Sequence, residues 1–302
     1  HSTAGHHVFA NFVISNLGIG DNACGLNISM TAPGGKSDIQ TEQLSGDEFS
    51  GKANKLALRC GSSSIKATNN SLHLKGEYSR LGLDLQITRK APGLAIKPFY
   101  LDADKSDYVH FNMPHVHSSA KGRIKWKGKW IDVTGHAMVA HVNQNVGLHD
   151  YSMRWNRIRS LTDDMTLLIG GFDATDEFEE GYNLLVIAKN DRILHATNQV
   201  KVKPVRFSLH DESDYQVPRA FELIAKDQRL DLAGTVKTYQ QIDEFEVLGH
   251  MSWIIRVIAK AFFANPWIFR NGIEFNLRYQ LDQGPSTQIL TKGVHEIIFV
   301  ND

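Results

Sequence analysis

The residues best suited to chemistry gather in one central stretch of the chain, between Trp126 and Asp164. Imidazole, amide, carboxylate, guanidinium and indole groups all occur there, and each can orient a polar or flat ligand. We expect a functional site in this stretch. The residues predicted to contact a ligand are His136, Gln144, Arg154, Trp155 and Asn156.

Acid–base catalysis without a cofactor is a second use of the same stretch. A histidine tuned near neutral pH, or a carboxylate with a raised pKa, can protonate an alkene inside a dry cavity. The candidate catalytic residues are His141, His149 and Asp150. Their spacing defines no acid–base constellation, because loop residues can point in any direction, so catalysis stays an alternative to binding.

A run of histidines raises the question of a metal site. Zinc needs three or four converging ligands, and neither an HExxH nor a CxxC spacing is present. We therefore predict structural or surface histidines, no metal and no other cofactor. The histidines concerned are His110, His115, His117, His136, His141 and His149.

The tripeptide Arg154-Trp155-Asn156 has two interpretations, because alternate residues of a strand face opposite sides. If Trp155 points inward, it is core or the flat wall of a pocket. If Arg154 points inward, its buried charge needs a partner, such as Asp132, Asp150 or a ligand headgroup.

The elements that must position these residues read as strands. We predict one strand at Trp130–His136, then a polar loop that carries histidines, then a second strand at Met153–Ile158. Leucines at alternate positions from Leu81 to Thr88 predict another. Strands recur about every eight to twelve residues with turn signals between them, which indicates an all-β barrel or sandwich.

One segment, Phe245–Ala264, predicts a long helix that is apolar nearly all round. It either packs as core across a barrel end or acts as a lid or membrane-touching element over an apolar cavity, with transient membrane contact through Met251–Phe263. We place a domain boundary between residues 202 and 203, which divides the chain into 1–202 and 203–302.

Composition excludes several classes of protein. The 302 residues are 42% hydrophobic and 22% charged, as in a folded domain protein, and Lys+Arg (33) balances Asp+Glu (33), so we expect no nucleic-acid partner. No apolar run reaches the roughly 18 residues of a spanning helix.

Cys24 and Cys60 are too few for a disulfide scaffold, and reduced core thiols are favoured over a pair. The cytoplasm is slightly favoured as compartment, and the sequence leaves the oligomeric state open.

Several segments in a shared order resemble the two-domain lipocalin-like proteins of the fungal survival-factor (Svf-like) type. The wider group includes AttH-like proteins, carotenoid 1,2-hydratases of the hydroxyneurosporene synthase type and fungal lipocalin-like Diels–Alderases. The segments that carry the resemblance are Phe12–Asn16, Leu85–Gly93, Val109–Pro114, Gly122–Ile124, Gln144 with His149, Arg154–Asn156, Phe245–Leu248 and Asn265–Trp267.

The resemblance implies an all-β fold of two lipocalin-like barrel or sandwich domains packed together, with the long apolar helix in the second. It also implies an opening strand before His1, so that the first barrel lacks one strand. The hydratase branch has an Asp-His pair where this chain has Ala140-His141, which puts acid-catalysed hydration in doubt.

We therefore expect the protein to bind or transfer a hydrophobic small molecule, lipid-like or isoprenoid-like, and the survival-factor branch implies sphingolipid-type cargo. The alternative is a cofactor-free hydratase, isomerase or cyclase that acts on a polyene. A third class, a protein–protein scaffold, would show a filled barrel and an exposed apolar patch.

Overall fold

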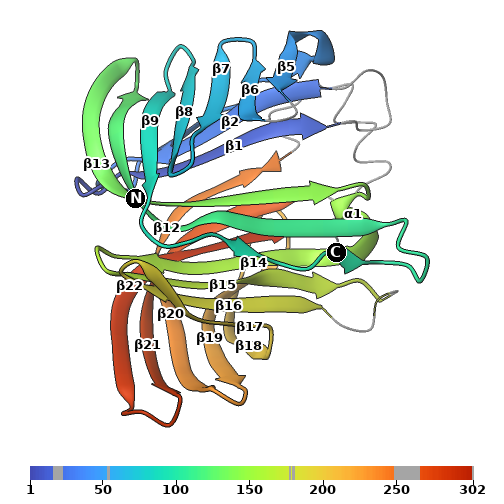
Figure 1. Ribbon diagram of the computed structural model, residues 1–302, viewed down its shortest axis with the longest axis vertical. Helices are drawn as coiled ribbons and strands as arrows, with labels where there is room; N and C mark the ends of the chain where they lie inside the picture. Colours follow the sequence, from blue (N-terminus) through green and yellow to red (C-terminus); the bar gives the residue numbers. More distant parts are fainter. Residues whose placement is uncertain (16–22, 53–54, 177, 179–180, 248–265, 301–302) are drawn as a thin grey trace. The chain divides into compact units, whose positions relative to one another are not determined.

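The computed structural model describes residues 1–15, 23–52, 55–176, 178, 181–247 and 266–300 (Figure 1). These residues form mainly antiparallel β-strands joined by turns and loops, which confirms the all-β class. The helical elements among them are a 3-10 turn, η1 (Gly46–Glu48), and one short helix, α1 (Leu148–Tyr151). No helix in the described ranges is long and apolar enough to cross a membrane.

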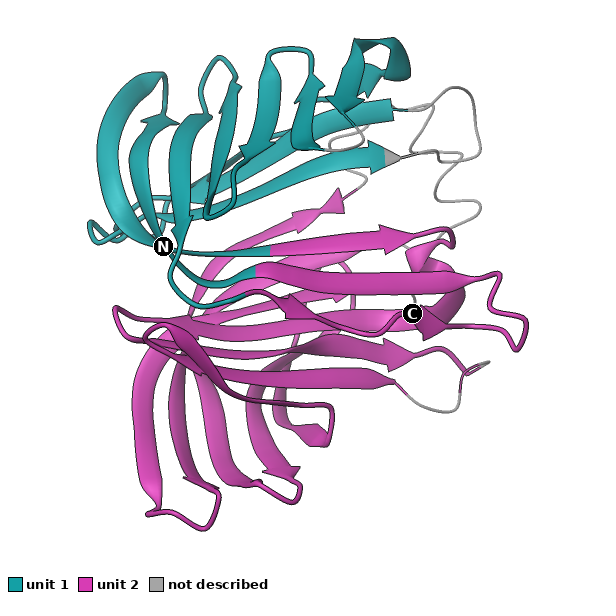
Figure 2. Cartoon of the chain, in the orientation of Figure 1, with its two compact units in different colours: residues 1–92, 115–139 teal, residues 93–114, 140–302 magenta. Residues whose placement is uncertain are grey.

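The chain forms two compact units (Figure 2). Unit 1 comprises His1–Pro92 and His115–Val139, and unit 2 comprises Gly93–Pro114 and Ala140–Asp302. Each unit is built on curled sheets, as expected for lipocalin-like domains. The boundary at 202/203 falls within a strand of unit 2, and the division into domains 1–202 and 203–302 stays a prediction.

Unit 1 contains a small sheet and most of a larger one. The small sheet consists of β1 (His7–Ser15), β2 (Ala23–Thr31), β3 (Ser37–Gln40) and β4 (Leu44–Ser45). The larger sheet runs in the order β10-β12-β9-β8-β7-β6-β5, and β11 and β13 also pair with β12. Its strands are β5 (Phe49–Lys52), β6 (Lys55–Cys60), β7 (Ser63–Ala67), β8 (Ser71–Glu77), β9 (Gly82–Arg89), β10 (Leu94–Ala95), β11 (Phe99–Tyr100), β12 (Tyr108–Trp126) and β13 (Lys129–Gln144).

The core of unit 1 forms because its strands alternate. Leu83, Leu85 and Ile87 of β9 are buried, while the residues between them face the other way. They pack with Leu26 and Ile28 of β2 in one apolar cluster. The alternation seen in the sequence at Leu81–Thr88 is thereby confirmed as a strand with one buried face.

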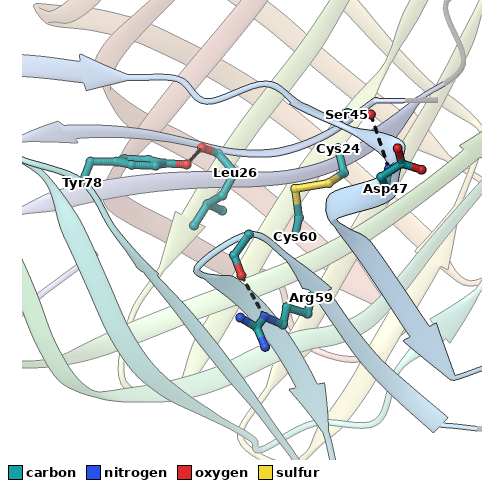
Figure 3. The surroundings of a disulfide bond; sticks show 8 residues. Cys24, Leu26, Ser45, Asp47, Arg59, Cys60 and Tyr78 are labelled. Atoms are coloured by element: carbon teal, nitrogen blue, oxygen red, sulfur yellow. Dashed lines mark hydrogen bonds between the residues drawn. A yellow bond between two sulfur atoms is a disulfide. The ribbon is translucent and has the colours of Figure 1, made fainter. Parts of the chain in front are cut away.

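A disulfide joins Cys24 of β2 to Cys60 of β6, both of which are buried (Figure 3). The preference for reduced thiols was therefore wrong. A count of cysteines carries no information about which strands meet, and here the fold brings the two Cα atoms to 6.0 Å. Close by, the Tyr78 hydroxyl donates to the Leu26 carbonyl.

Unit 2 is built on one nine-stranded sheet in the order β17-β16-β15-β14-β22-β21-β20-β19-β18. One face carries an apolar core of Leu, Ile, Val and Phe side chains, with Phe221 and Phe275 fully buried. The strands are β14 (Ser152–Leu161), β15 (Met165–Ala174), β16 (Tyr182–Lys189), β17 (Arg192–Thr197), β18 (Val200–Leu209), β19 (Gln216–Lys226), β20 (Leu230–Glu246), β21 (Trp267–Leu281) and β22 (Thr287–Phe299).

One expectation about local structure needs correction, and another falls mostly outside the described residues. The strand expected at Trp130–His136 continues to Gln144, so most of the predicted polar loop is strand; Ala137 and Val139 continue the inward alternation. The long helix is not shown. Its expected first residues, Phe245 and Glu246, end strand β20, and residues 248–265, with the membrane contact expected at Met251–Phe263, lie outside the described residues.

Candidate functional site

An aromatic cluster lies on the face of the unit 2 sheet opposite the apolar core. Its rings are Phe99 of β11, Tyr151 of α1, Trp155 of β14, Phe172 of β15 and Tyr182 of β16. The ring centroid of Phe172 lies 5.1 Å from that of Tyr151, 5.3 Å from Trp155 and 5.4 Å from Phe99. Strand register assembles the cluster, since Trp155 lies opposite Phe172 and Phe172 opposite Tyr182.

A buried phenol and an amide give this cluster a polar edge. The Tyr151 hydroxyl donates to Gln144 Oε1 at 3.0 Å, and Gln144 Nε2 donates to the Val146 carbonyl at 2.9 Å. Burial raises the pKa of Tyr151 above its ordinary value. The phenol therefore stays protonated at neutral pH and acts as a donor.

The three candidate catalytic residues lie at the surface of unit 2. His141 on β13 is exposed. His149 Nε2 and Asp150 Oδ1 form a pair at 3.1 Å, with side chains 33% and 50% exposed. Asp150 Oδ2 also accepts the Gly147 N–H at 2.7 Å, which fixes the start of α1. These residues lack the dry surroundings that proton transfer to an alkene requires.

Arg154 and Asn156 are both engaged within the protein. Arg154 forms an ion pair with Asp173, not with the expected Asp132 or Asp150, because β14 pairs with β15 and places the two residues opposite each other. Asn156 Oδ1 lies 3.3 Å from His295 Nε2 on the core side, so Trp155 and Asn156 do face opposite ways.

His136 lies in unit 1, whereas the other predicted site residues lie in unit 2. Its ring stacks on that of His117, with centroids 6.3 Å apart and planes inclined by 11°. Within the described residues no group of three His, Cys, Asp or Glu side chains is arranged to hold a metal ion.

A surface groove of about 440 Å³ opens beside the aromatic cluster. Phe178, which packs against the cluster, also lines the groove. The remaining lining is polar or small: Asp173, Ala174, Thr175, Asp176, Gly181 and Asn183. The groove thus combines hydroxyl, amide and carboxylate groups with one aromatic wall.

A buried ionic cluster lies on the same face of the unit 2 sheet. Glu296 of β22 pairs with Arg157 and, at 2.5 Å, with Arg270, while Arg159 lies 4.0 Å away and Asp243 pairs with Arg270 at 3.1 Å. Burial works to raise the pKa of Glu296, but the guanidinium groups outweigh it and hold the pKa far below its ordinary value. Both charges of the central pair, Glu296 and Arg270, are 2% exposed.

Comparison with known proteins decides the family. The model of the Svf1 family matches residues 1–301. The chain belongs to the Svf1 family. A curated relative, the ceramide-binding protein svf1 of Aspergillus fumigatus, is 25% identical over 207 residues, which is 62% of this chain and 50% of the relative. The chain thus spans about half the length of that Svf1 protein.

Solved structures support the fold of this Svf1-family chain. An AttH-like protein from Nitrosomonas europaea covers 98% of the chain with a TM-score of 0.66 and 14% identity, over 88% of its own length. Kievitone hydratase from Nectria haematococca covers 99% with a TM-score of 0.57 and 10% identity, over 90% of its own length. At such identities the likeness concerns architecture and not activity.

Sequence reasoning missed several members of the site in this Svf1-family protein. Tyr151 and Phe172 were not singled out, although Tyr151 directly follows Asp150. Glu296 had a visible signal, since it is the one acidic residue in the apolar run from Val294 to Val300. A carboxylate inside such a run must be paired when it is buried.

Proposed function

We propose that this Svf1-family protein binds a hydrophobic small molecule of the ceramide class and carries it between surfaces. The observation that carries the proposal is the match to a ceramide-binding protein over 207 residues, within a family model that spans the chain. The resemblance to survival-factor proteins, with its sphingolipid-type cargo, favours the same class.

We further propose that the ligand binds at the groove of unit 2 beside the aromatic cluster. A ceramide has an amide and hydroxyl groups but no charge, so its headgroup needs donors and acceptors without a counter-ion. Thr175 and Asn183 offer such groups, and the Arg154–Asp173 pair is internally neutral. Phe178 offers an apolar wall, where burial contributes about 25 cal/mol per Å².

Native mass spectrometry with lipid extraction, on protein purified from its own host, tests the proposal. We expect a stoichiometric ceramide-class lipid, and we expect purified protein to take up a long-chain ceramide added in detergent. A ligand that gains the mass of water on prolonged incubation would favour the hydratase alternative. Protein that carries no lipid and takes up none from a lipid panel would contradict the function.

The location has its own test. The double variant Phe178→Ala with Asn183→Leu removes the aromatic wall and a polar partner, and we expect ceramide affinity to fall at least about tenfold. The matched control is Thr88→Val, which lies in a second groove of about 950 Å³ in unit 1. Unchanged affinity in the double variant would show that ceramide binds elsewhere, without touching the proposed function.

A further inference from the structure

The outermost strand of unit 2 has an unused edge. β18 ends the nine-stranded sheet and pairs with β19; among the described residues no strand pairs with its other side. An unpaired strand edge presents backbone donors and acceptors that can pair with another chain.

Large apolar side chains are exposed along this strand. Val205 is 47% exposed, Phe207 44% and Leu209 63%. The core residues of the neighbouring strand, such as Phe221 and Leu223, lie on the opposite face. The exposed apolar side chains of β18 therefore form a stripe on the outside of unit 2.

Two register shifts interrupt the pairing of β18 with β19. One occurs between Pro204 and Arg206 and the other between Arg206 and Phe207. They cancel, because Lys203 lies opposite Glu222 and Phe207 opposite Pro218 in the same register. Lys203, Phe207 and Leu209 thus lie on one face, and Val205, which lies in the bulge between them, is exposed as well.

Extended to Asp211, an exposed residue in the turn two positions after the end of β18, the stripe is self-complementary in chemical character. A cation, Lys203, begins it and an anion, Asp211, ends it; Val205 and Leu209 flank the central Phe207. In an antiparallel pair with a second copy, centred on Phe207, each Lys203 meets the other Asp211 and each Val205 meets the other Leu209. A twofold interface requires this kind of self-complementarity.

We propose that β18 pairs with β18 of a second copy of this chain, antiparallel and centred on Phe207, to form a twofold dimer. The present partner of Lys203 is weak, since its contact with Glu222 is 3.9 Å long and both side chains are exposed. The proposal goes beyond lipid binding and does not depend on it.

The chemistry at the ends of the stripe agrees with this register. Pro204, which has no N–H, comes to lie opposite His210. The N–H of His210 is bonded to the Tyr215 carbonyl, and its carbonyl accepts the Asp214 N–H. Neither backbone group of His210 needs a partner from the second copy. The hydrogen bonds between the two β18 strands can therefore end at the pair formed by Pro204 of one copy and His210 of the other.

A charge exchange tests the register. Sedimentation of the full chain over a range of concentrations should show a monomer–dimer equilibrium. Lys203→Asp and Asp211→Lys should each weaken dimerisation at least about tenfold, because like charges then meet twice by symmetry. The double variant K203D/D211K should restore it to within about threefold.

The matched control is Lys129→Asp, an exposed residue of unit 1 that changes the net charge equally. A protein that stays monomeric at every concentration would overturn the proposal. So would a dimer that the single variants leave unchanged, because the contact then lies elsewhere.

A cross-link tests the centre of the pair. Cys24 and Cys60 are bonded to each other, so a cysteine at position 207 is the only free thiol. Directly opposed strand residues have Cα atoms about 4.5–5.5 Å apart, within the range of a disulfide. Phe207→Cys should therefore give a disulfide-linked dimer under mild oxidation, and Tyr239→Cys, which is 45% exposed, should not.

The other occupant of an exposed apolar stripe is a lipid surface, and flotation with phosphatidylcholine–phosphatidylserine vesicles distinguishes it. If the wild-type protein is monomeric and floats with vesicles, and Phe207→Ser no longer floats, the stripe is a membrane contact and the dimer proposal is overturned. Loss of the dimer in Phe207→Ser, with ceramide uptake intact, supports the proposal.

Discussion

Unit 1 and unit 2 are both built from curled antiparallel sheets, but they fix their strands by different means. In unit 1 a covalent bond, Cys24–Cys60, joins the small sheet to the large one across an apolar core. In unit 2 the apolar core covers one face of a single sheet, and the other face holds an ionic cluster centred on Glu296.

Each unit should therefore be sensitive to a different kind of change. A buried ion pair contributes little net stability, because the desolvation of both charges offsets their attraction, but it ties particular strands together. Here Glu296 draws Arg157 of β14 and Arg270 of β21 onto β22. A disulfide acts chiefly on the unfolded chain and is indifferent to protonation. Unit 1 should therefore respond to reductant and unit 2 to charge.

The largest effect is expected from Glu296→Gln. The amide cannot balance the buried guanidinium groups, of which Arg270 is 2% exposed, so the variant leaves uncompensated charge inside unit 2. We expect the free energy of unfolding to fall by about 3–5 kcal/mol, measured by chemical denaturation.

The control for this charge is Glu274→Gln, at an exposed residue of β21 whose Oε1 lies 3.6 Å from Nζ of Lys292 on β22. Its loss should cost less than about 1 kcal/mol. If both variants lost the same stability, the ionic cluster would not be what distinguishes unit 2.

The second effect concerns unit 1. The disulfide closes a loop with a sequence separation of 36 residues, so its removal should cost about 2–4 kcal/mol. The double variant C24S/C60S should lower the denaturant midpoint, and reductant should do the same to the wild-type chain. Ceramide uptake at the groove of unit 2 should survive wherever the chain is folded. A double variant that is as stable as the wild-type chain would show that the disulfide does not stabilise unit 1.

Much of the fold was predictable because it is local. The alternation of leucines in β9 predicts both the strand and its buried face, and the family resemblance predicts the two lipocalin-like domains. Element ends were harder. The strand β13 continues to Gln144 because Ala137 and Val139 pack against the core of unit 1. The polar residues in this part of the strand led to the prediction of a loop.

The site was predictable only in part because it is assembled by strand pairing. The central stretch does supply Gln144 and Trp155 to the aromatic cluster region, but their partners Phe172 and Tyr182 come from strands that only the register brings alongside. The disulfide and the Glu296 cluster have the same origin. Each joins residues that are far apart in the sequence, and the spacing of residues within one segment does not predict such contacts.

The smallest expected effect is a dependence of stability on pH. His295 in unit 2 is fully buried, and burial lowers its pKa to about 3, whereas the unfolded chain should titrate near the ordinary value of 6.5. Between these values the unfolded state binds a proton that the folded state does not, so stability is lost as the pH falls below about 6.5. The depressed pKa of Glu296 adds its own loss only at lower pH, below its ordinary value of 4.5.

We therefore expect the wild-type protein to lose about 1 kcal/mol more than His295→Gln between pH 6.5 and 5.5, measured by denaturation at each pH. Glutamine keeps an amide N–H for Asn156 Oδ1 and removes the titration. In unit 1, His115 also has a pKa lowered by burial and by Arg89, so it contributes a loss of the same sign to both proteins and cancels in the difference.

His73→Gln, at an exposed histidine paired with Asp84, is the control. Equal pH slopes for the wild-type protein and His295→Gln would mean that the buried imidazole is not a source of acid sensitivity in unit 2.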